Sequence, residues 1–191
     1  MGTVLIKSKQ ERNTMDSQLT DTNNGISRGV LQSLKAMLSK PSDIYKLFFL
    51  FTKKLNRFFP ISQSSLIVFS KQDNKLKVIA MKGDKGARKG LTLTLPETNS
   101  LLYKVFADGH FYTKHHPQKF DGNFIEEKIL KDNDARSLAI LPIVQNGLKC
   151  GLICLSSPNQ DAFRSFENGS MDEILENFSK NMIKRMPSSC I

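Results

Sequence analysis

Long hydrophobic runs are missing from this sequence of 191 residues. A membrane-spanning helix needs roughly 20 consecutive apolar residues, whereas the longest candidate, 47–52, ends at Lys53 and Lys54. The N-terminal segment also lacks the apolar core and the small-residue cleavage site of a secretory signal peptide. We therefore expect no transmembrane segment and a cytoplasmic location.

Cysteine is scarce, since the chain has only Cys150, Cys154 and Cys190. Three thiols do not make the disulfide framework of a small secreted protein. Cys150 and Cys154 are four residues apart on one expected strand, so they should share a face but lie about 13 Å apart, too far for a bridge. This pattern favours a reducing compartment and thiols that fill the core.

No catalytic or nucleic-acid-binding motif is evident in the sequence. Three histidines, His110, His115 and His116, lie close together beside Tyr112. Histidine is a common metal ligand, but acidic and cysteine partners at metal-ligand spacing are absent around them. We interpret them first as surface or structural residues, second as ligand contacts and last as metal ligands, and we expect neither catalytic nor metal-binding residues.

The net charge of +10 is spread unevenly along the chain. Residues 26–60 hold seven basic side chains against one acidic, and residues 71–90 hold seven against two. Three glycines alternate with basic residues over 82–90, but their spacing fits no nucleotide-binding fingerprint and predicts a basic hairpin loop. A basic surface attracts nucleic acid or anionic membranes, although a solvated lysine-rich face is the simpler interpretation.

Apolar residues at helical spacing predict one helix before Pro41, a second from Ser42 to Pro60 and a last one over 170–186. Residues 96–135 are expected to form an insertion with a short helix at 100–107 and one or two helical turns around 123–131. Alternating and apolar runs predict the remaining elements as strands. These expected strands are 65–70, 75–81, 91–95, 110–113, 136–144 and 149–156.

The segment 134–157 is the most informative part of the chain. Asn146 and Gly147 stand between two apolar runs, a strong signal for a tight hairpin turn. Both runs are apolar almost throughout instead of alternating, so both faces of this hairpin should be covered. Helices from the two ends of the chain can cover one face of the sheet, and the 96–135 insertion is left to cover the other.

With these elements in order, the chain resembles a GAF domain, the small-ligand and signalling module related to PAS domains, over about 43–186. The resemblance rests on the segments 43–59, 65–83, 91–112 and, above all, 136–157 followed by Phe163 and a terminal helix. The family pattern in the last hairpin is a small residue, an apolar run, a proline, a glycine turn and a second glycine. Ser137, Pro142, Gly147 and Gly151 match it.

The resemblance implies an α+β fold with a central antiparallel sheet of about six strands, terminal helices on one face and the insertion over the other. It also implies a regulatory or sensory function in signal transduction, in which the module binds a small molecule, dimerises, or does both, and acts on a signalling partner in trans. We expect no enzyme activity, and the cofactor stays unknown. The candidate ligand-binding residues are Phe106, His110, Tyr112, Phe120, Phe124, Arg136, Leu138 and Ile140.

Each of these candidates has a simpler interpretation as well. Arg136 would form a salt bridge with Asp132 or Asp134, and at least two of the aromatic residues would only fill the core. Three departures from the family also narrow the ligand. The insertion has no cysteine to attach a bilin, the signature of the cyclic-nucleotide members is missing, and Cys150 and Cys154 do not flank the pocket as in members that reduce free methionine sulfoxide.

The expected organisation is a flexible polar tail at 1–25, a single domain over 26–187 and a short tail at 188–191. Within the domain we expect N-terminal helices at 26–59, the sheet with its insertion at 65–156 and the C-terminal helix at 170–186. The apolar residues of the first helix have no obvious partner within one domain, which predicts a homodimer through the terminal helices. Two alternatives stay open: a basic-surface adaptor for nucleic acid or anionic membrane, and a thiol redox enzyme that uses Cys150 and Cys154.

Overall fold

The computed structural model describes residues 43–115, 120–131, 134–169 and 171–186, together with the helical residues Gln32 and Ala36. Apart from Gln32 and Ala36, the predicted helix before Pro41, with its apolar face, lies outside the described residues. The helices are α2 (Ile44–Leu55), α3 (Leu101–Asp108), α4 (Phe124–Leu130), the 3-10 helix η2 (Arg164–Asn168) and α5 (Asp172–Ile183). The strands are β1 (Gln63–Ser70), β2 (Lys75–Gly83), β3 (Gly86–Thr94), β4 (Tyr112–His115), β5 (Ser137–Gln145) and β6 (Leu148–Ser157).

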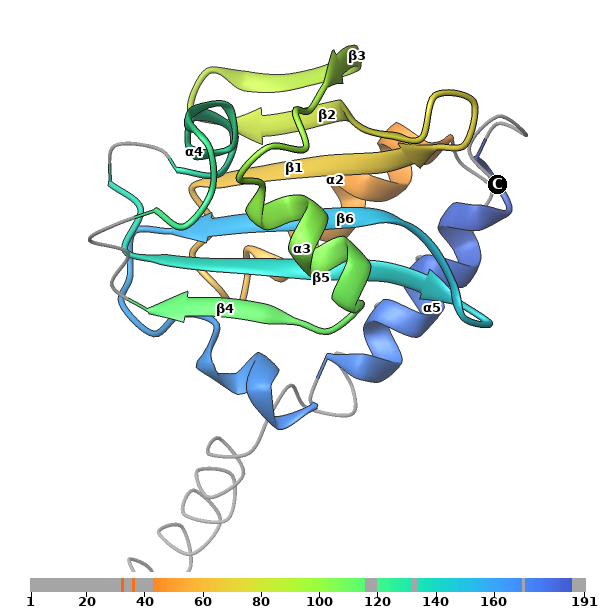
Figure 1. Ribbon diagram of the computed structural model, residues 1–191. Coiled ribbons are helices and arrows are strands. Elements are labelled where there is room, and N and C mark those ends of the chain that lie inside the picture. The colour runs from red at the N-terminus through yellow and green to blue at the C-terminus, as the bar shows by residue number, and fades with distance from the viewer. Residues whose placement is uncertain are drawn as a thin grey trace, which may run out of the picture.

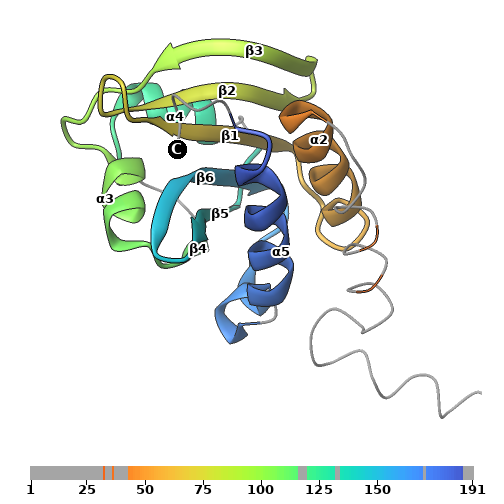
Figure 2. The same cartoon turned by 90° about the vertical axis from the view of Figure 1, so that its right-hand side faces the viewer.

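The strands in the described part of the chain form one antiparallel sheet of six, in the order β3-β2-β1-β6-β5-β4. Figure 1 shows the sheet with α3 and α4 in front of it, and Figure 2 shows α2 and α5 on the opposite face. The predicted α+β architecture is therefore confirmed, with terminal helices on one face and the insertion on the other. Among the described residues, no helix combines the length and apolar character needed to cross a membrane.

The hairpin of β5 and β6 has the predicted tight turn and is covered on both faces. Asn146 and Gly147 take φ angles of 49° and 78°, the left-handed pair that a two-residue hairpin turn requires. One apolar cluster, under α2, η2 and α5, contains Leu141, Ile143, Ile153 and Leu155. A second cluster, under α3 and α4, contains Leu138, Ile140 and Leu152. The near-continuous apolar pattern thus reflects burial on alternate sides.

The expectation that Cys150 and Cys154 share a face is wrong. The pairing of β5 with β6 shifts register between Ile143 and Val144, which pair with Gly151 and Lys149, so that Cys150 is the extra residue of a bulge. A bulge reverses the alternation of side chains beyond it. Cys150 consequently packs in the cluster under α2 and α5, whereas Cys154 packs in the cluster under α3 and α4.

The segment 83–90, expected to be a loop, is mostly strand. β3 begins at Gly86 and pairs with β2 through Gly83–Gly86, Lys82–Ala87 and Met81–Arg88, so only Asp84 and Lys85 remain in the turn. The hairpin part of that prediction is confirmed, but its loop is much shorter. Gly86 and Gly90 have φ angles of 88° and 71°, which glycine accepts without strain. The glycines that favoured a loop instead allow a strongly irregular edge strand.

Two hydrogen-bonded caps begin the helices of the insertion. Ser100 accepts a hydrogen bond from the backbone N–H of Tyr103 at the start of α3, and Gly109 ends that helix at a φ angle of 80°. Asn123 begins α4 in a capping box, since its side chain accepts from the N–H of Glu126 while the Glu126 carboxylate accepts from the N–H of Asn123. Local sequence therefore sets where both helices start.

Gly151 is required where β6 pairs with β1. A Cβ atom at this position would overlap the backbone carbonyl oxygen of Ile67 and lie 3.0 Å from the Cα atom of Val68. Backbone atoms of two paired central strands cannot move aside cheaply. The glycine thus permits the close approach of β1 and β6 at the centre of the sheet.

We expect Gly151→Ala to lower the free energy of unfolding by roughly 1–3 kcal/mol, the usual cost of forcing an extra carbon into a packed site. Urea denaturation followed by circular dichroism measures this loss. Gly83→Ala is the matched control, because its Cβ would meet nothing closer than 3.6 Å. Equal losses in the two variants would contradict the steric explanation.

Candidate functional site

Five of the eight predicted pocket residues gather between the sheet and the insertion. Leu138 and Ile140 are fully buried in the apolar cluster on that face. Phe106, Tyr112 and Phe120 pack against the same cluster as partly buried side chains. The Phe106 ring also stacks on Phe69, with ring centroids 4.9 Å apart. These contacts are those of core packing, and ligand binding by this group stays a prediction.

The other three predicted residues, His110, Phe124 and Arg136, are exposed to solvent and do not converge with the first five. Phe124 is 70% exposed, and its ring lies 5.2 Å from the ammonium nitrogen of Lys128 on the next turn of α4. Arg136 joins the sheet through its backbone N–H, which donates to the carbonyl of Ser157 at 2.7 Å. No ion pair links Arg136 to Asp134 among the described residues, and Asp132 lies outside them.

The pKa of Tyr112 is raised more strongly than that of the other described tyrosines. The Tyr112 hydroxyl donates to Oδ2 of Asp121 at 2.9 Å, which links β4 to the segment just before α4. Burial raises the pKa of Tyr112 to about 12, and the hydrogen bond to Asp121 acts in the same direction. The raised pKa keeps this phenol a hydrogen-bond donor into the alkaline range, where an ordinary tyrosine ionises.

Glu126 is a fully buried carboxylate that sequence reasoning missed. It accepts hydrogen bonds from the hydroxyl of Ser100 and from the backbone N–H groups of Leu101 at 2.9 Å and Leu102 at 3.2 Å. The two N–H groups belong to the first turn of α3, where they have no acceptor within the helix. The positive end of the helix dipole also favours a carboxylate there. Glu126 thus joins α4 to α3. A capping box with a glutamate at 123–126 was the signal that could have revealed it.

Cys154 is buried in the apolar cluster under α3 and α4. Burial raises the pKa of the Cys154 thiol well above its ordinary value, and the negative charge of Glu126 adds to the effect. The thiolate is the nucleophilic form of cysteine. Cys150 packs on the other face of the sheet, so the two thiols named in the thiol-enzyme alternative do not face one pocket.

His115 connects β4 to the segment before α5. Its Nε2 lies 2.9 Å from Oε1 of Glu167, and its Nδ1 lies 3.3 Å from Oδ1 of Asp161. The two carboxylates therefore approach opposite edges of the imidazole ring and do not converge on one point. No group of three or more metal-ligating side chains is found in the described ranges, and His116 lies outside them.

A basic groove of about 370 Å³ lies at the end of the sheet, between the β2–β3 hairpin and α4. Figure 1 shows these elements next to each other, with α4 beside the end of β2. The groove is open to solvent and lies beyond the apolar cluster of the insertion. It is lined by Gln63, Met81, Lys82, Gly83, Asp84, Lys85, Arg88, Lys128, Lys131 and Asp134.

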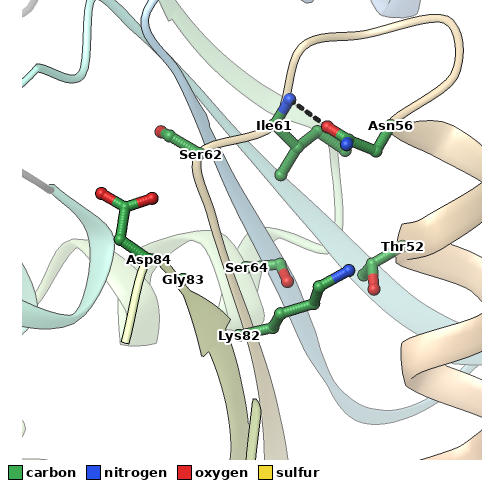
Figure 3. A pocket seen from close by; sticks show the side chains of 8 residues that line it. All are labelled: Thr52, Asn56, Ile61, Ser62, Ser64, Lys82, Gly83 and Asp84. Atoms are coloured by element: carbon green, nitrogen blue, oxygen red, sulfur yellow. Dashed lines mark hydrogen bonds between the residues drawn. The ribbon is translucent and has the colours of Figure 1, made fainter. Parts of the chain in front are cut away.

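Five basic residues and two acidic residues line the groove, and the Lys82 side chain extends toward α2 (Figure 3). Two of the basic residues have neighbours on α4: Lys131 lies 3.9 Å from Glu127, and Lys128 lies over the ring of Phe124. The other three, Lys82, Lys85 and Arg88, form no ion pair with any described residue. The unpaired cations of the hairpin face the basic residues of α4, which makes the groove suited to an anion.

The basic residues of the β2–β3 hairpin were recognised in the sequence, but their partners were not. Lys128 and Lys131 lie about 40 residues further along the chain, and only the fold brings them opposite Lys85 and Arg88. Helical spacing of three places Lys128 and Lys131 on one side of the end of α4. That spacing was a weak signal in the sequence.

The fold is similar to that of solved GAF domains, at low sequence identity. The GAF domain of an Acinetobacter phosphoenolpyruvate-protein phosphotransferase has 10% identity and a TM-score of 0.64, covering 83% of this chain and 95% of its own. The GAF domain of a two-component sensor histidine kinase from Bacillus halodurans has 14% identity and a TM-score of 0.56, covering 74% and 97%. No protein-family model and no curated protein matches the sequence. The predicted GAF-like fold is confirmed.

The expectation of no enzyme activity is wrong, because enzymes are among the solved structures with a similar fold. Free methionine-R-sulfoxide reductase from Neisseria meningitidis, solved with its substrate, has 14% identity and a TM-score of 0.64, covering 83% of this chain and 89% of its own. Reductases of the same kind from Staphylococcus aureus and Thermoplasma acidophilum are also structural neighbours. Since enzymes share this fold, a GAF-like architecture is compatible with catalysis and gives no ground for excluding it.

We expect Glu126→Ala to lower the free energy of unfolding by at least about 2 kcal/mol, because it leaves several buried donors of α3 without an acceptor. Chemical denaturation measures the loss, and hydrogen exchange should locate it in the first turn of α3. Glu127→Ala is the matched control, since its side chain is 40% exposed and makes only a 3.9 Å ion pair with Lys131. A similar loss in the control would contradict a specific role for Glu126.

The hydroxyl of Thr113 donates to Oε1 of Glu167 at 2.5 Å and lowers the pKa of that carboxyl, and His115 acts in the same direction. A lowered pKa means that the ionised form favours the folded state. This stabilisation is complete above the ordinary pKa of 4.5 and is lost as the pH falls through the lowered value.

Thr113→Val should therefore raise the pKa of Glu167 toward its ordinary value and weaken the acid dependence of stability in that range. Side-chain carboxyl chemical shifts followed by NMR during a pH titration measure the change. Asp73, whose pKa is lowered by its contact with Lys77 in another hairpin, serves as the internal control and should not move. An unchanged pKa for Glu167 in the variant would overturn this assignment.

Proposed function

We propose that this protein is a regulatory or sensory GAF-like module whose state is set by an anionic small molecule bound in the basic groove. The ligand carries phosphate or carboxylate groups. The observation that carries the proposal is the convergence of four cations, Lys85, Arg88, Lys128 and Lys131, around a cavity of about 370 Å³ between the β2–β3 hairpin and α4. Ligand pockets usually fall in the range of roughly 300–1,000 Å³, so the groove suits a molecule of nucleotide size.

The charge of the groove supports an anion more strongly than a neutral ligand. Lys85 and Arg88 lie on the exposed edge of the hairpin, where their side chains can reach a bound molecule without leaving a buried partner behind. An arginine can bind a phosphate or a carboxylate through two parallel hydrogen bonds, while lysines contribute point charges. Met81 and Gln63 supply an apolar and a polar surface beside these cations.

The position of the groove gives a route from ligand to signal. α4 forms one wall, and its buried Glu126 is hydrogen-bonded to the first turn of α3. A ligand that draws α4 toward the hairpin would act on α3 through this contact. In this proposal the module works in the cytoplasm, as a homodimer through its terminal helices, and passes the change to a partner protein in trans.

The basic surface also keeps the adaptor hypothesis open, since nucleic acid and anionic membranes are attracted by the same cations. A concave groove that holds two carboxylates beside its cations favours a single small molecule over a long polyanion. Binding of an oligonucleotide or of phosphatidylserine vesicles without binding of small anions would favour the adaptor and count against our proposal.

The test is isothermal titration of the protein with ATP and with pyrophosphate at two salt concentrations. We expect saturable binding that weakens as salt rises, because surface charges are screened. The double variant Lys85→Glu, Arg88→Glu should bind at least about tenfold more weakly, since each charge-assisted hydrogen bond contributes roughly 1.5–3 kcal/mol.

Lys180→Glu, Lys184→Glu is the matched control, because it makes the same change in charge at the C-terminal end of α5, on the other face of the sheet. Binding should be retained in this variant. No saturable binding of either probe, or equal weakening in both double variants, would overturn the proposal.

A further inference from the structure

A second, smaller cavity of about 150 Å³ lies on the opposite side of β2 from the basic groove, against α2. Ala80 packs in the cluster under α2, and Met81 packs against the cluster under the insertion. Because side chains alternate along a strand, Lys82 points to the α2 side. Figure 3 shows the residues that line this cavity: Thr52, Asn56, Ile61, Ser62, Ser64, Lys82, Gly83 and Asp84.

The orientation of Asn56 is set by the backbone. Its Oδ1 accepts a hydrogen bond from the N–H of Ile61 at 2.6 Å, drawn as the dashed line in Figure 3. Only the oxygen of an amide can accept from an N–H, so the amino group must occupy the other position. This Nδ2 group has no hydrogen-bond acceptor among the described residues. It offers two N–H donors at the cavity.

Two nearly buried hydroxyl groups complete the polar lining. Thr52 and Ser64 are 2% exposed, and both residues line the cavity. The Thr52 hydroxyl donates to the carbonyl of Phe49 at 3.2 Å, so its lone pairs are left to accept. The Ser64 hydroxyl has no hydrogen bond to a described residue and can therefore donate to a bound group.

Lys82 supplies the positive charge of the cavity. In Figure 3 its side chain extends toward Thr52, whereas the carboxylate of Asp84 points away from it. No ion pair compensates Lys82 within the described part of the chain. The ammonium group, the Asn56 amino group and the Ser64 hydroxyl thus come from β2, the C-cap of α2 and β1, and all three can donate.

We propose that this cavity is a second anion site, which takes one small oxyanion group, phosphate or carboxylate. Its volume corresponds to roughly five water molecules at about 30 Å³ each, which is room for inorganic phosphate or acetate but not for a nucleotide. Donors without acceptors and one uncompensated cation define the ligand chemistry. The site goes beyond the function proposed for the groove, since Asn56 and Ser64 do not line the groove.

The test is an NMR titration of the isotope-labelled protein with inorganic phosphate and, separately, with acetate, at ionic strength held constant with sodium chloride. We expect saturable shifts of the Asn56 side-chain amide signals and of the backbone amide of Ser64, two residues that line this cavity and not the groove. Comparison of the two probes distinguishes a phosphate site from a carboxylate site.

Asn56→Asp is the discriminating variant. It keeps the oxygen that accepts from the N–H of Ile61 and replaces the amino donor with a second oxygen, so the fold is retained while the anion is repelled. We expect at least about tenfold weaker binding. Ser64→Ala, which removes one hydroxyl, should weaken binding by a few-fold.

The groove variants separate this proposal from the proposed function. Lys85→Glu, Arg88→Glu should leave the phosphate- or acetate-induced shifts of Asn56 and Ser64 unchanged, and Asn56→Asp should leave ATP binding in the groove unchanged. The second site is refuted if neither probe gives saturable shifts in the parent protein, or if Asn56→Asp binds both probes as the parent does. Failure of ATP to bind while these shifts persist would remove only the groove.

Discussion

The buried carboxylate of Glu126 is the contact on which the insertion depends. A charged group without exposure to solvent is costly unless its oxygens are hydrogen-bonded, and here they accept from Ser100, Leu101 and Leu102 as well as from Asn123. The same group therefore caps α4, its own helix, and the first turn of α3. Apolar contacts hold these helices against the sheet, but they are non-directional. The carboxylate supplies the direction, because its two oxygens fix how α3 and α4 meet.

Much of the fold follows from local sequence. Asn146-Gly147 predicted the turn of the β5–β6 hairpin, continuous apolar runs predicted its burial on both faces, and the order of the elements predicted the layers. The bulge at Cys150 could not be predicted in this way, because one extra residue leaves the apolar pattern of a doubly buried strand unchanged. The strand over 86–90 was missed for a related reason. Its glycines resemble a loop in sequence, and only pairing with β2 makes them a strand.

The candidate sites depend on contacts between segments far apart in sequence, so they were less predictable than the fold. Aromatic residues of the insertion suggested a pocket, but Phe106 and Phe120 pack against the core while His110 and Phe124 face solvent. A periodic pattern tells which side chains are apolar and not whether space remains between them. The cavities lie instead at the end of β2, where Lys82, Gly83 and Asp84 line both. One short segment thus separates two polar environments on the two sides of the sheet.

The bulge in β6 has a consequence for how this protein can be observed. Because it turns Cys150 toward the terminal helices and Cys154 toward the insertion, each layer contains one native thiol. A buried thiol reacts only when the layer above it opens, so its trapping rate reports the free energy of that opening. Cys150 and Cys154 can therefore serve as intrinsic probes, one for each half of the core, so that motion of the terminal helices can be measured separately from motion of the insertion.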